Sequence, residues 1–162
     1  MHPCPCGFFS DPRKACRCNT TKIANYMGKI SGPLLDRIDI HIEIPAVKYK
    51  ELTETKDAEA SSVIKARVEK TRAIQRGRFK TEPIPVFCNA QMNVKLIKKY
   101  CGLEGEAKEL LKMAMTELGL SARTYDRVLK VSRTIADLAD SEIILCEHIS
   151  EAVQYRSLDK QW

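Results

Sequence analysis

The C-terminal two thirds of the chain repeat apolar residues at helical spacing. Between residues 107 and 118 they recur at i, i+3, i+4, i+7, i+8 and i+11, and Gly119 follows at the place of a helix C-cap. Ser121 is a candidate N-cap for a second amphipathic helix. Shorter helices are predicted at residues 93–100 and 147–155. Amphipathic helices in this order predict a small helical bundle.

A different period marks the region before residue 45. Apolar and polar residues alternate strictly there, with Ile38, Ile40, Ile42 and Ile44 separated by Asp39, His41 and Glu43. A period of two predicts a strand with one buried and one exposed face, which Pro45 ends. Before it, apolar residues at helical spacing predict a short helix with Thr20 or Thr21 as its N-cap.

The polar stretch at residues 48–57 has no periodicity, and it predicts a linker between two regions. Residues 1–47 would hold a cysteine-rich loop, a helix and the strand. Residues 58–162 would be all helical. The predicted fold class is therefore mainly α.

Composition narrows the class of protein. The chain has 162 residues, 44% of them hydrophobic and 30% charged, which suits one ordinary core. No apolar run is long enough to cross a bilayer, and the first residues lack the features of a signal peptide. We therefore expect a cytoplasmic protein without membrane contact, in which seven cysteines do not form a disulfide framework.

The N-terminal cysteines form two pairs, Cys4 with Cys6 and Cys16 with Cys18, around a loop that contains Gly, Asp and Pro. Two such pairs can bring four thiolates together as a tetrahedral Zn²⁺ site. A loop this short cannot form its own core, so a metal would replace one. The spacing C-x-C is less usual than C-x-x-C, and free or buried thiols are the alternative. Cys88, Cys101 and Cys146 are expected to act as small hydrophobic residues.

A strongly basic helix is predicted at residues 58–76. Between residues 64 and 80 there are seven basic residues and one acidic residue. Lys65, Arg72 and Arg76 share one stripe of this helix. Val63, Ile64 and Val68 form another stripe, which is expected to pack inward. The basic stripe could neutralise phosphates of DNA, or it could be only a solvated face.

Two arginines, Arg37 and Arg123, lie at positions in the sequence that would favour binding of an anion. Arg37 lies at the predicted strand entrance, where its rigid guanidinium fits phosphate oxygens, although an ion pair with Asp36 or Asp39 is an equal alternative. Arg123 falls in the first turn after Ser121, where the helix dipole disfavours a cation unless an anion is bound. Arg123 could instead point to water.

Several motifs together resemble the C-terminal part of the bacterial magnesium-chelatase-like AAA+ ATPases of the ComM (YifB) competence-protein family. They are MHPCPCG at residues 1–7, ISGPLLDRID at 30–39, LSARTY at 120–125, RVLKV at 127–131, TIADLA at 134–139, and HI at 148–149 with QYRSL at 154–158. The resemblance covers nearly the whole chain. It implies that residues 1–47 are the end of an AAA+ α/β core and that residues 58–162 are the helical lid.

The resemblance also implies roles for single residues. Arg37 matches the arginine finger that acts on a neighbouring subunit's nucleotide, and Arg123 matches the sensor-2 arginine of the lid. ATP and Mg²⁺ would be the cofactors of the intact protein. It would be a homo-oligomer, expected to be a hexameric ring, that couples ATP hydrolysis to DNA remodelling or branch migration.

Two features depart from the family pattern. His2 occupies the place of the sensor-1 asparagine, and imidazole cannot offer the donor and acceptor of an amide together. No G-x-x-x-x-G-K-[ST] sequence and no acidic strand end for Mg²⁺ occur, so the chain is expected to be inactive alone. The alternatives are a zinc-stabilised DNA-binding module without nucleotide and a chelatase-type protein partner in metal insertion.

Overall fold

A computed structural model describes residues 2–44, 47 and 58–156, and every regular element in these residues is helical. The chain divides into two compact units. One comprises Met1–Ile38 and Glu43–Glu54, and the other comprises Asp39–Ile42 and Thr55–Trp162. The mainly α fold class is confirmed. The linker predicted at residues 48–57 lies outside the described residues.

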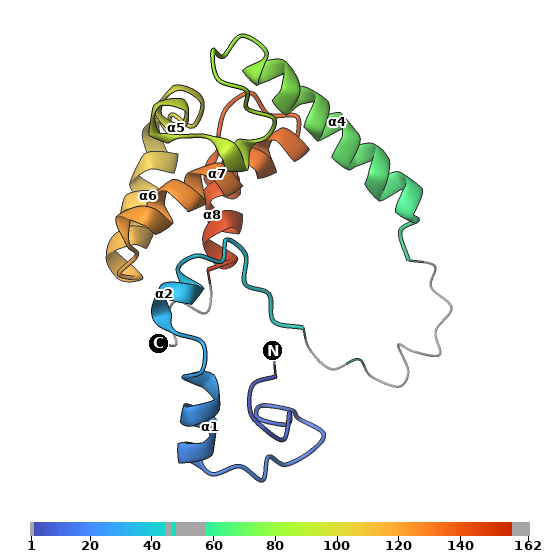
Figure 1. The fold of residues 1–162 in the computed structure, drawn as a ribbon, viewed down its shortest axis with the longest axis vertical. Coiled ribbons are helices and arrows are strands. Elements are labelled where there is room, and N and C mark those ends of the chain that lie inside the picture. Colours follow the sequence, from blue (N-terminus) through green and yellow to red (C-terminus); the bar gives the residue numbers. More distant parts are fainter. Residues whose placement is uncertain (1, 45–46, 48–57, 157–162) are drawn as a thin grey trace. The chain divides into compact units, whose positions relative to one another are not determined.

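The first unit contains α1 (Thr20–Met27) and α2 (Gly32–Leu35) after the cysteine loop (Figure 1). The N-cap of α1 is Asn19, whose side chain accepts a hydrogen bond from the Lys22 N–H at 2.8 Å. The prediction of Thr20 or Thr21 as N-cap was therefore wrong by one or two residues. Asparagine caps a helix better than threonine because its short amide reaches the free N–H groups readily.

The predicted strand at residues 38–44 was wrong as well, since no strand is assigned anywhere in the described part of the chain. The isoleucines of the alternation are exposed, from 41% at Ile38 to 84% at Ile44. The backbone N–H of His41 donates to the Tyr155 carbonyl at 2.7 Å. Alternation identifies an apolar face, but a strand also needs a neighbouring strand to pair with its backbone.

The second unit is the predicted helical bundle (Figure 1). Its elements are α4 (Ser61–Phe79), the 3₁₀ turn η1 (Asn89–Gln91), α5 (Val94–Tyr100), α6 (Gly105–Glu117), α7 (Ala122–Leu138) and α8 (Cys146–Gln154). α7 is central, because α4, η1, α5 and α8 all pack on it, and α8 also packs on α6. Ser121 caps α7 as predicted by accepting a hydrogen bond from the Thr124 N–H at 3.1 Å. None of the described helices combines the length and the apolar character that a membrane span requires.

One apolar core fills the bundle. Its fully enclosed members include Leu111 of α6, Val128 of α7 and Ile149 of α8, each no more than 1% exposed. Cys101 belongs to this core, as its small hydrophobic side chain predicted, and burial raises the pKa of its thiol to about 11. Cys88 and Cys146 are half-buried.

α4 does not pack as its apolar pattern predicted. Val63, Ile64 and Val68 are 54%, 41% and 41% exposed, and every residue from 61 to 70 is exposed. The buried positions come later in the helix, at Thr71, Gln75 and Phe79. The helix also begins at Ser61 and ends at Phe79, rather than spanning residues 58–76. Periodicity showed an apolar stripe, but which part of it meets the core depends on tertiary contacts.

A buried ionic network attaches the end of α4 to α7. The Asp137 carboxylate is fully buried and accepts hydrogen bonds from the guanidinium of Arg78, from Arg133 Nε at 3.0 Å and from Asn89 Nδ2 at 2.8 Å. Burial alone raises the pKa of Asp137, but the hydrogen bonds from Arg78 and Asn89 and the two guanidinium charges lower it below its ordinary value. Arg133 also donates to the carbonyls of Ser141 and Glu142, which anchors the turn before α8.

Candidate metal centre and candidate nucleotide-contacting residues

The cysteine loop is folded by tight turns between its two cysteine pairs. The Gly7 N–H donates to the Cys4 carbonyl at 3.0 Å, and the Asp11 N–H donates to the Phe8 carbonyl at 3.1 Å. Gly7 has φ of +81°, a backbone conformation that glycine adopts without strain. These turns reverse the chain, so that Cys16 returns to Cys4 and Cys6.

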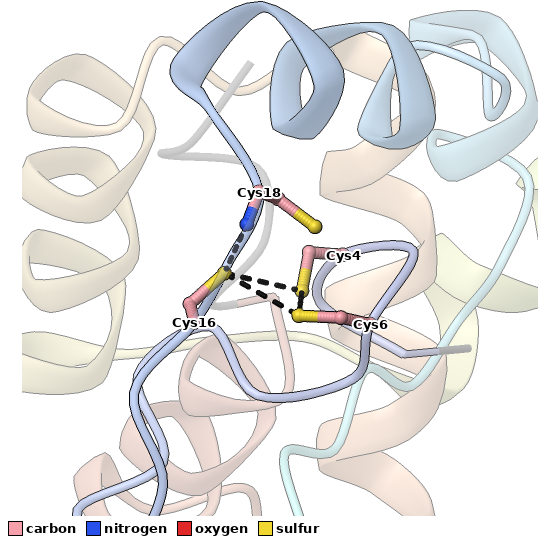
Figure 2. Close-up of side chains that lie close together, drawn as sticks. All are labelled: Cys4, Cys6, Cys16 and Cys18. Carbon is pink, nitrogen blue, oxygen red and sulfur yellow. Dashed lines mark hydrogen bonds between the residues drawn. The ribbon is translucent and has the colours of Figure 1, made fainter.

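The four thiols converge on one point, as Figure 2 shows. Sγ of Cys4 is 3.3 Å from that of Cys6 and 3.7 Å from that of Cys16, and Sγ of Cys6 is 3.5 Å from that of Cys16. Including Cys18, all four sulfur atoms lie within 4.8 Å of one another. A tetrahedron with Zn–S bonds of ~2.3 Å has edges of about 3.8 Å. The donor set and its spacing therefore fit a structural Zn²⁺ ion, and Cys4, Cys6, Cys16 and Cys18 are the residues that would hold it.

The electrostatics of the cluster are uneven. Backbone N–H groups of Phe8 and Arg17 lower the pKa of Cys6 to about 6. The backbone N–H of Cys18 acts in the same direction on Cys16, but burial and the neighbouring thiols outweigh it and raise the pKa of Cys16 to about 12. A divalent cation reverses such an increase, because coordination deprotonates a thiol.

His2 lies beside this loop rather than inside the thiol cluster. Its side chain is exposed, and a Cβ atom added to Gly7 would be 3.6 Å from its Nδ1. A larger residue at position 7 would therefore contact the imidazole. His2 remains a predicted sensor-1 position.

The two arginines singled out by the sequence lie in different units. Arg37 is exposed and follows Asp36, the C-cap of α2, in the first unit. Arg123 is the second residue of α7, exposed, and lies at a groove in the second unit. Arg123 lies in a helix first turn, as the sequence predicted. The predicted strand entrance at Arg37 was wrong, because residues 38–44 form no strand and Arg37 instead follows a short helix.

The groove beside Arg123 has a volume of about 580 Å³. α7 supplies most of its lining, and residues 39–42, Ala90 of η1, Glu151 of α8 and its C-cap Tyr155 supply the rest. Its apolar residues include Ile42, Val131 and Ile135. Three cations line it at i, i+4 and i+7 of α7, namely Arg123, Arg127 and Lys130. Asp39 forms an ion pair with Arg127, and Lys130 Nζ donates to the Ala90 carbonyl at 3.0 Å.

The ion pair of Arg127 was not predicted, and Asp39 was expected only as an alternative partner of Arg37. The helical spacing of Arg123, Arg127 and Lys130 was the local signal that could have placed Arg127 at the groove. The pairing of Asp39 with Arg127 joins residues 88 positions apart, and no local pattern indicates it.

The basic charges of α4 differ in how far they are neutralised. Arg67 pairs with Glu59 at 3.0 Å, Lys70 pairs with Asp140, and Arg78 pairs with the buried Asp137. The predicted DNA-contacting residues Lys65, Arg72 and Arg76 are all exposed. Among the residues that the structure describes, none forms an ion pair with these three.

Comparison with known proteins places both units in one group. Residues 58–156 match the family described as magnesium chelatase, subunit ChlI C-terminal, and residues 1–52 match the family described as magnesium chelatase, subunit ChlI. Competence protein ComM of Haemophilus influenzae is 38% identical over 98% of this chain, and protein YifB of Escherichia coli is 37% identical over 99%. YifB of Salmonella typhimurium is 35% identical over 99%.

The chain spans only 30% of the length of each of these relatives. The first family match covers more than half of the chain and includes all of α4 to α8. The chain therefore belongs to the magnesium chelatase subunit ChlI C-terminal family.

Proposed function

We propose that this chain acts as the C-terminal part of a magnesium-chelatase-like AAA+ ATPase. In this role Arg37 is an arginine finger that reaches the nucleotide of a neighbouring subunit. Arg123 is a sensor-2 residue that contacts the γ-phosphate in its own subunit. ATP and Mg²⁺ bind to a nucleotide-binding core that the 162 residues do not include, and hydrolysis is coupled to DNA remodelling by a ring of subunits.

The observation that carries this proposal is the setting of Arg123. It combines a guanidinium, the N-terminal end of a 17-residue helix and an adjoining groove in a chain of this family. The helix dipole attracts anions at that end, and a guanidinium adds charged hydrogen bonds to phosphate oxygens. The same dipole disfavours a cation in the first turn, so a phosphate is the ligand that suits this position.

The first test is the upstream reading frame, in which the proposal expects a G-x-x-x-x-G-K-[ST] sequence. In the protein that carries it, Arg123→Ala should impair ATP turnover within its own subunit. Arg37→Ala should reduce turnover by roughly 10³-fold, as for other arginine fingers. Lys108→Ala is the matched control, since Lys108 is an exposed cation on α6 away from the groove.

Mixing variant subunits distinguishes an arginine that acts on a neighbouring subunit from one that acts within its own. Subunits lacking Arg37 and subunits lacking the P-loop lysine should regain activity together, because mixed rings pair an intact finger with an intact nucleotide site. Full activity of Arg37→Ala, or no recovery in mixed rings that do assemble, would mean that Arg37 is not a trans-acting finger. It would then be a structural ion-pair partner.

The thiol cluster has a structural role in this proposal. Cys4, Cys6, Cys16 and Cys18 would hold Zn²⁺, which supplies the crosslink that the loop lacks. Structural zinc sites contribute folding free energy directly.

A second candidate function is DNA binding by α4 without nucleotide. The exposed stripe of Lys65, Arg72 and Arg76 favours it, because neutralising phosphates is the main source of DNA affinity. Reversing all three to glutamate should weaken binding and reduce the salt slope by ~0.9 for each lost phosphate contact. Reversing the exposed Lys95, Lys98 and Lys108 changes the net charge equally and is the matched control. Equal loss in both triple variants would indicate a solvated face and a general effect of charge.

A further inference from the structure

Contacts with α7 and with the C-cap of α8 hold residues 39–42 on the bundle. The Asp39 carboxylate forms an ion pair with Arg127 of α7. The His41 backbone N–H donates to the carbonyl of Tyr155, the C-cap of α8, at 2.7 Å. The His41 side chain is buried, at 6% exposure. A charged contact to α7 and a backbone contact to the C-cap of α8 thus both attach this four-residue segment.

The same segment also helps to line the groove. Ile40 and Ile42 line the groove on the side of the segment, and Val131 and Ile135 line it on the side of α7. The segment therefore forms part of the groove wall, and its position contributes to the shape of the groove.

The fastened residues are close in the chain to both arginines of the proposed function. Asp39 follows Arg37 by two residues, a separation of about 7 Å at most. Arg127 follows Arg123 by four residues on α7, which is about one helical turn, or ~6 Å along the axis. The Asp39–Arg127 contact therefore joins the segment that leaves Arg37 to the helix turn that bears Arg123.

Charge gives the contact a second effect. Arg123 and Arg127 carry like charges at i and i+4, which repel each other across one turn. Asp39 pairs with Arg127 and so offsets the charge of one of the two cations. Exposed ion pairs contribute little to stability. The value of this contact therefore lies in positioning.

We propose that Asp39, His41 and Arg127 form a latch that couples Arg37 to Arg123, so that the nucleotide state at one site of the ring is transmitted to the next. The proposal rests on the proposed function, in which the two arginines act on nucleotides held by different subunits. Asp39 and Arg127 are positioning residues that act through the arginines. When the Asp39–Arg127 contact breaks, the position of Arg37 no longer depends on whether a γ-phosphate is bound in its own subunit.

Hydrogen exchange tests the latch itself, without any ATPase assay. In the present chain, Asp39→Asn and Arg127→Gln should each speed exchange at the His41 amide several-fold. The double variant should exchange no faster than either single variant, because both remove the same contact. Asp140→Asn is the matched control. Asp140 also pairs with a cation, Lys70, its side chain is 52% exposed like that of Asp39, and asparagine accepts its φ of +55°.

ATPase kinetics test the coupling in the protein that carries the nucleotide-binding core. Turnover should rise cooperatively with ATP concentration in the parent and in Asp140→Asn. Asp39→Asn should bring the Hill coefficient to about 1 while each site still hydrolyses ATP. A merely structural contact would lower the amount of folded protein without changing the Hill coefficient.

The outcomes separate this proposal from the one on which it rests. Unchanged His41 exchange in both single variants, a parent Hill coefficient of 1, or full cooperativity in Asp39→Asn would each overturn the latch. Normal turnover in both Arg37→Ala and Arg123→Ala would overturn the proposed function instead. Impaired turnover in those two variants with an unchanged Hill coefficient in Asp39→Asn would leave the proposed function standing and remove the latch.

Discussion

The two compact units differ in what holds them together. The bundle encloses an apolar core to which α4, α5, α6, α7 and α8 all contribute. In the described residues of the first unit, the buried apolar side chains are Cys4 and Leu35 alone. α1 has no buried residue, and its apolar side chains, such as Ile23 and Met27, are half-buried.

This difference shows that one chain can combine two sources of stability. Burying apolar surface stabilises the bundle, at ~25 cal/mol per Å². The first unit buries too little for that, so the four converging thiols are its best substitute for a core. Removing either source should damage one unit and leave the other folded.

Loss of metal should have the largest effect. Purified chain is expected to hold about one equivalent of zinc in tetrahedral thiolate geometry, and structural zinc sites contribute about 10 kcal/mol or more of apparent binding free energy. Cys16→Ser with Cys18→Ser should abolish metal binding and unfold the cysteine loop, with most helical circular dichroism retained. Cys88→Ser with Cys146→Ser removes two cysteines outside the cluster and should keep the metal. Equal metal content in both double variants would refute the site.

The next largest effect is expected inside the bundle, at Asp137. Asp137→Asn leaves the half-buried Arg78 and the buried Arg133 without their anion, and it should lower the free energy of unfolding by about 3–5 kcal/mol. Thermal or urea unfolding followed by helical circular dichroism measures this. Asp140→Asn, at an exposed ion pair, should change it by less than about 0.5 kcal/mol. Similar values for the two variants would show that the buried network adds no more than a surface pair.

Lowering the pH should remove part of the stabilisation that the ionised Asp137 carboxylate provides. The pKa of Asp137 is lowered in the folded chain, so its stabilisation is complete above its unfolded value of 3.8 and is lost as pH falls through the folded pKa. The difference in unfolding free energy between the parent and Asp137→Asn should therefore narrow as pH falls below about 4. A constant difference down to pH 2 would contradict this account of the network.

The smallest effect is expected on the exposed half of α4. Val68→Ala should leave the free energy of unfolding unchanged within about 0.5 kcal/mol, because Val68 is 41% exposed and alanine favours helix. Val128→Ala removes the same atoms from the core and should cost about 1.6 kcal/mol or more. Equal costs at the two positions would mean that α4 packs on the bundle along its full length.

Local patterns predicted most of the helices. Apolar periodicity located α6 and α7, local patterns also indicated α5 and α8, and the N-cap Ser121 was recognised from its residue type. The strand prediction at residues 38–44 was wrong because a strand must pair with a neighbouring strand, which the alternation of apolar and polar residues does not reveal. The prediction that Val63 and Val68 of α4 pack inward was wrong for a related reason. Apolar residue type suggests a core position, but it does not show which part of the helix the core contacts.

The candidate sites also divide into one that a local sequence pattern predicts and others that only the tertiary fold brings together. Two cysteine pairs separated by a short turn-forming loop are a local signal, and the structure brings their four thiols together. The network around Asp137 and the Asp39–Arg127 contact join residues 59 and 88 positions apart. Tertiary folding makes such pairs, and a single sequence does not reveal them.

The exposed first half of α4 affects how fast this part of the helix can form when a ligand binds to it, and how much ordering the ligand must impose. A free helix of about ten residues is marginal in water, because the first turn must be ordered before hydrogen bonds repay it. In α4 the turns around Thr71, Gln75 and Phe79 are already held by the bundle, so they act as a permanent nucleus. Residues 61–70 extend from it by propagation alone, one hydrogen bond for each residue ordered. A ligand that meets this half of α4 therefore encounters a helix that can fray and reform turn by turn within nanoseconds, without a nucleation barrier.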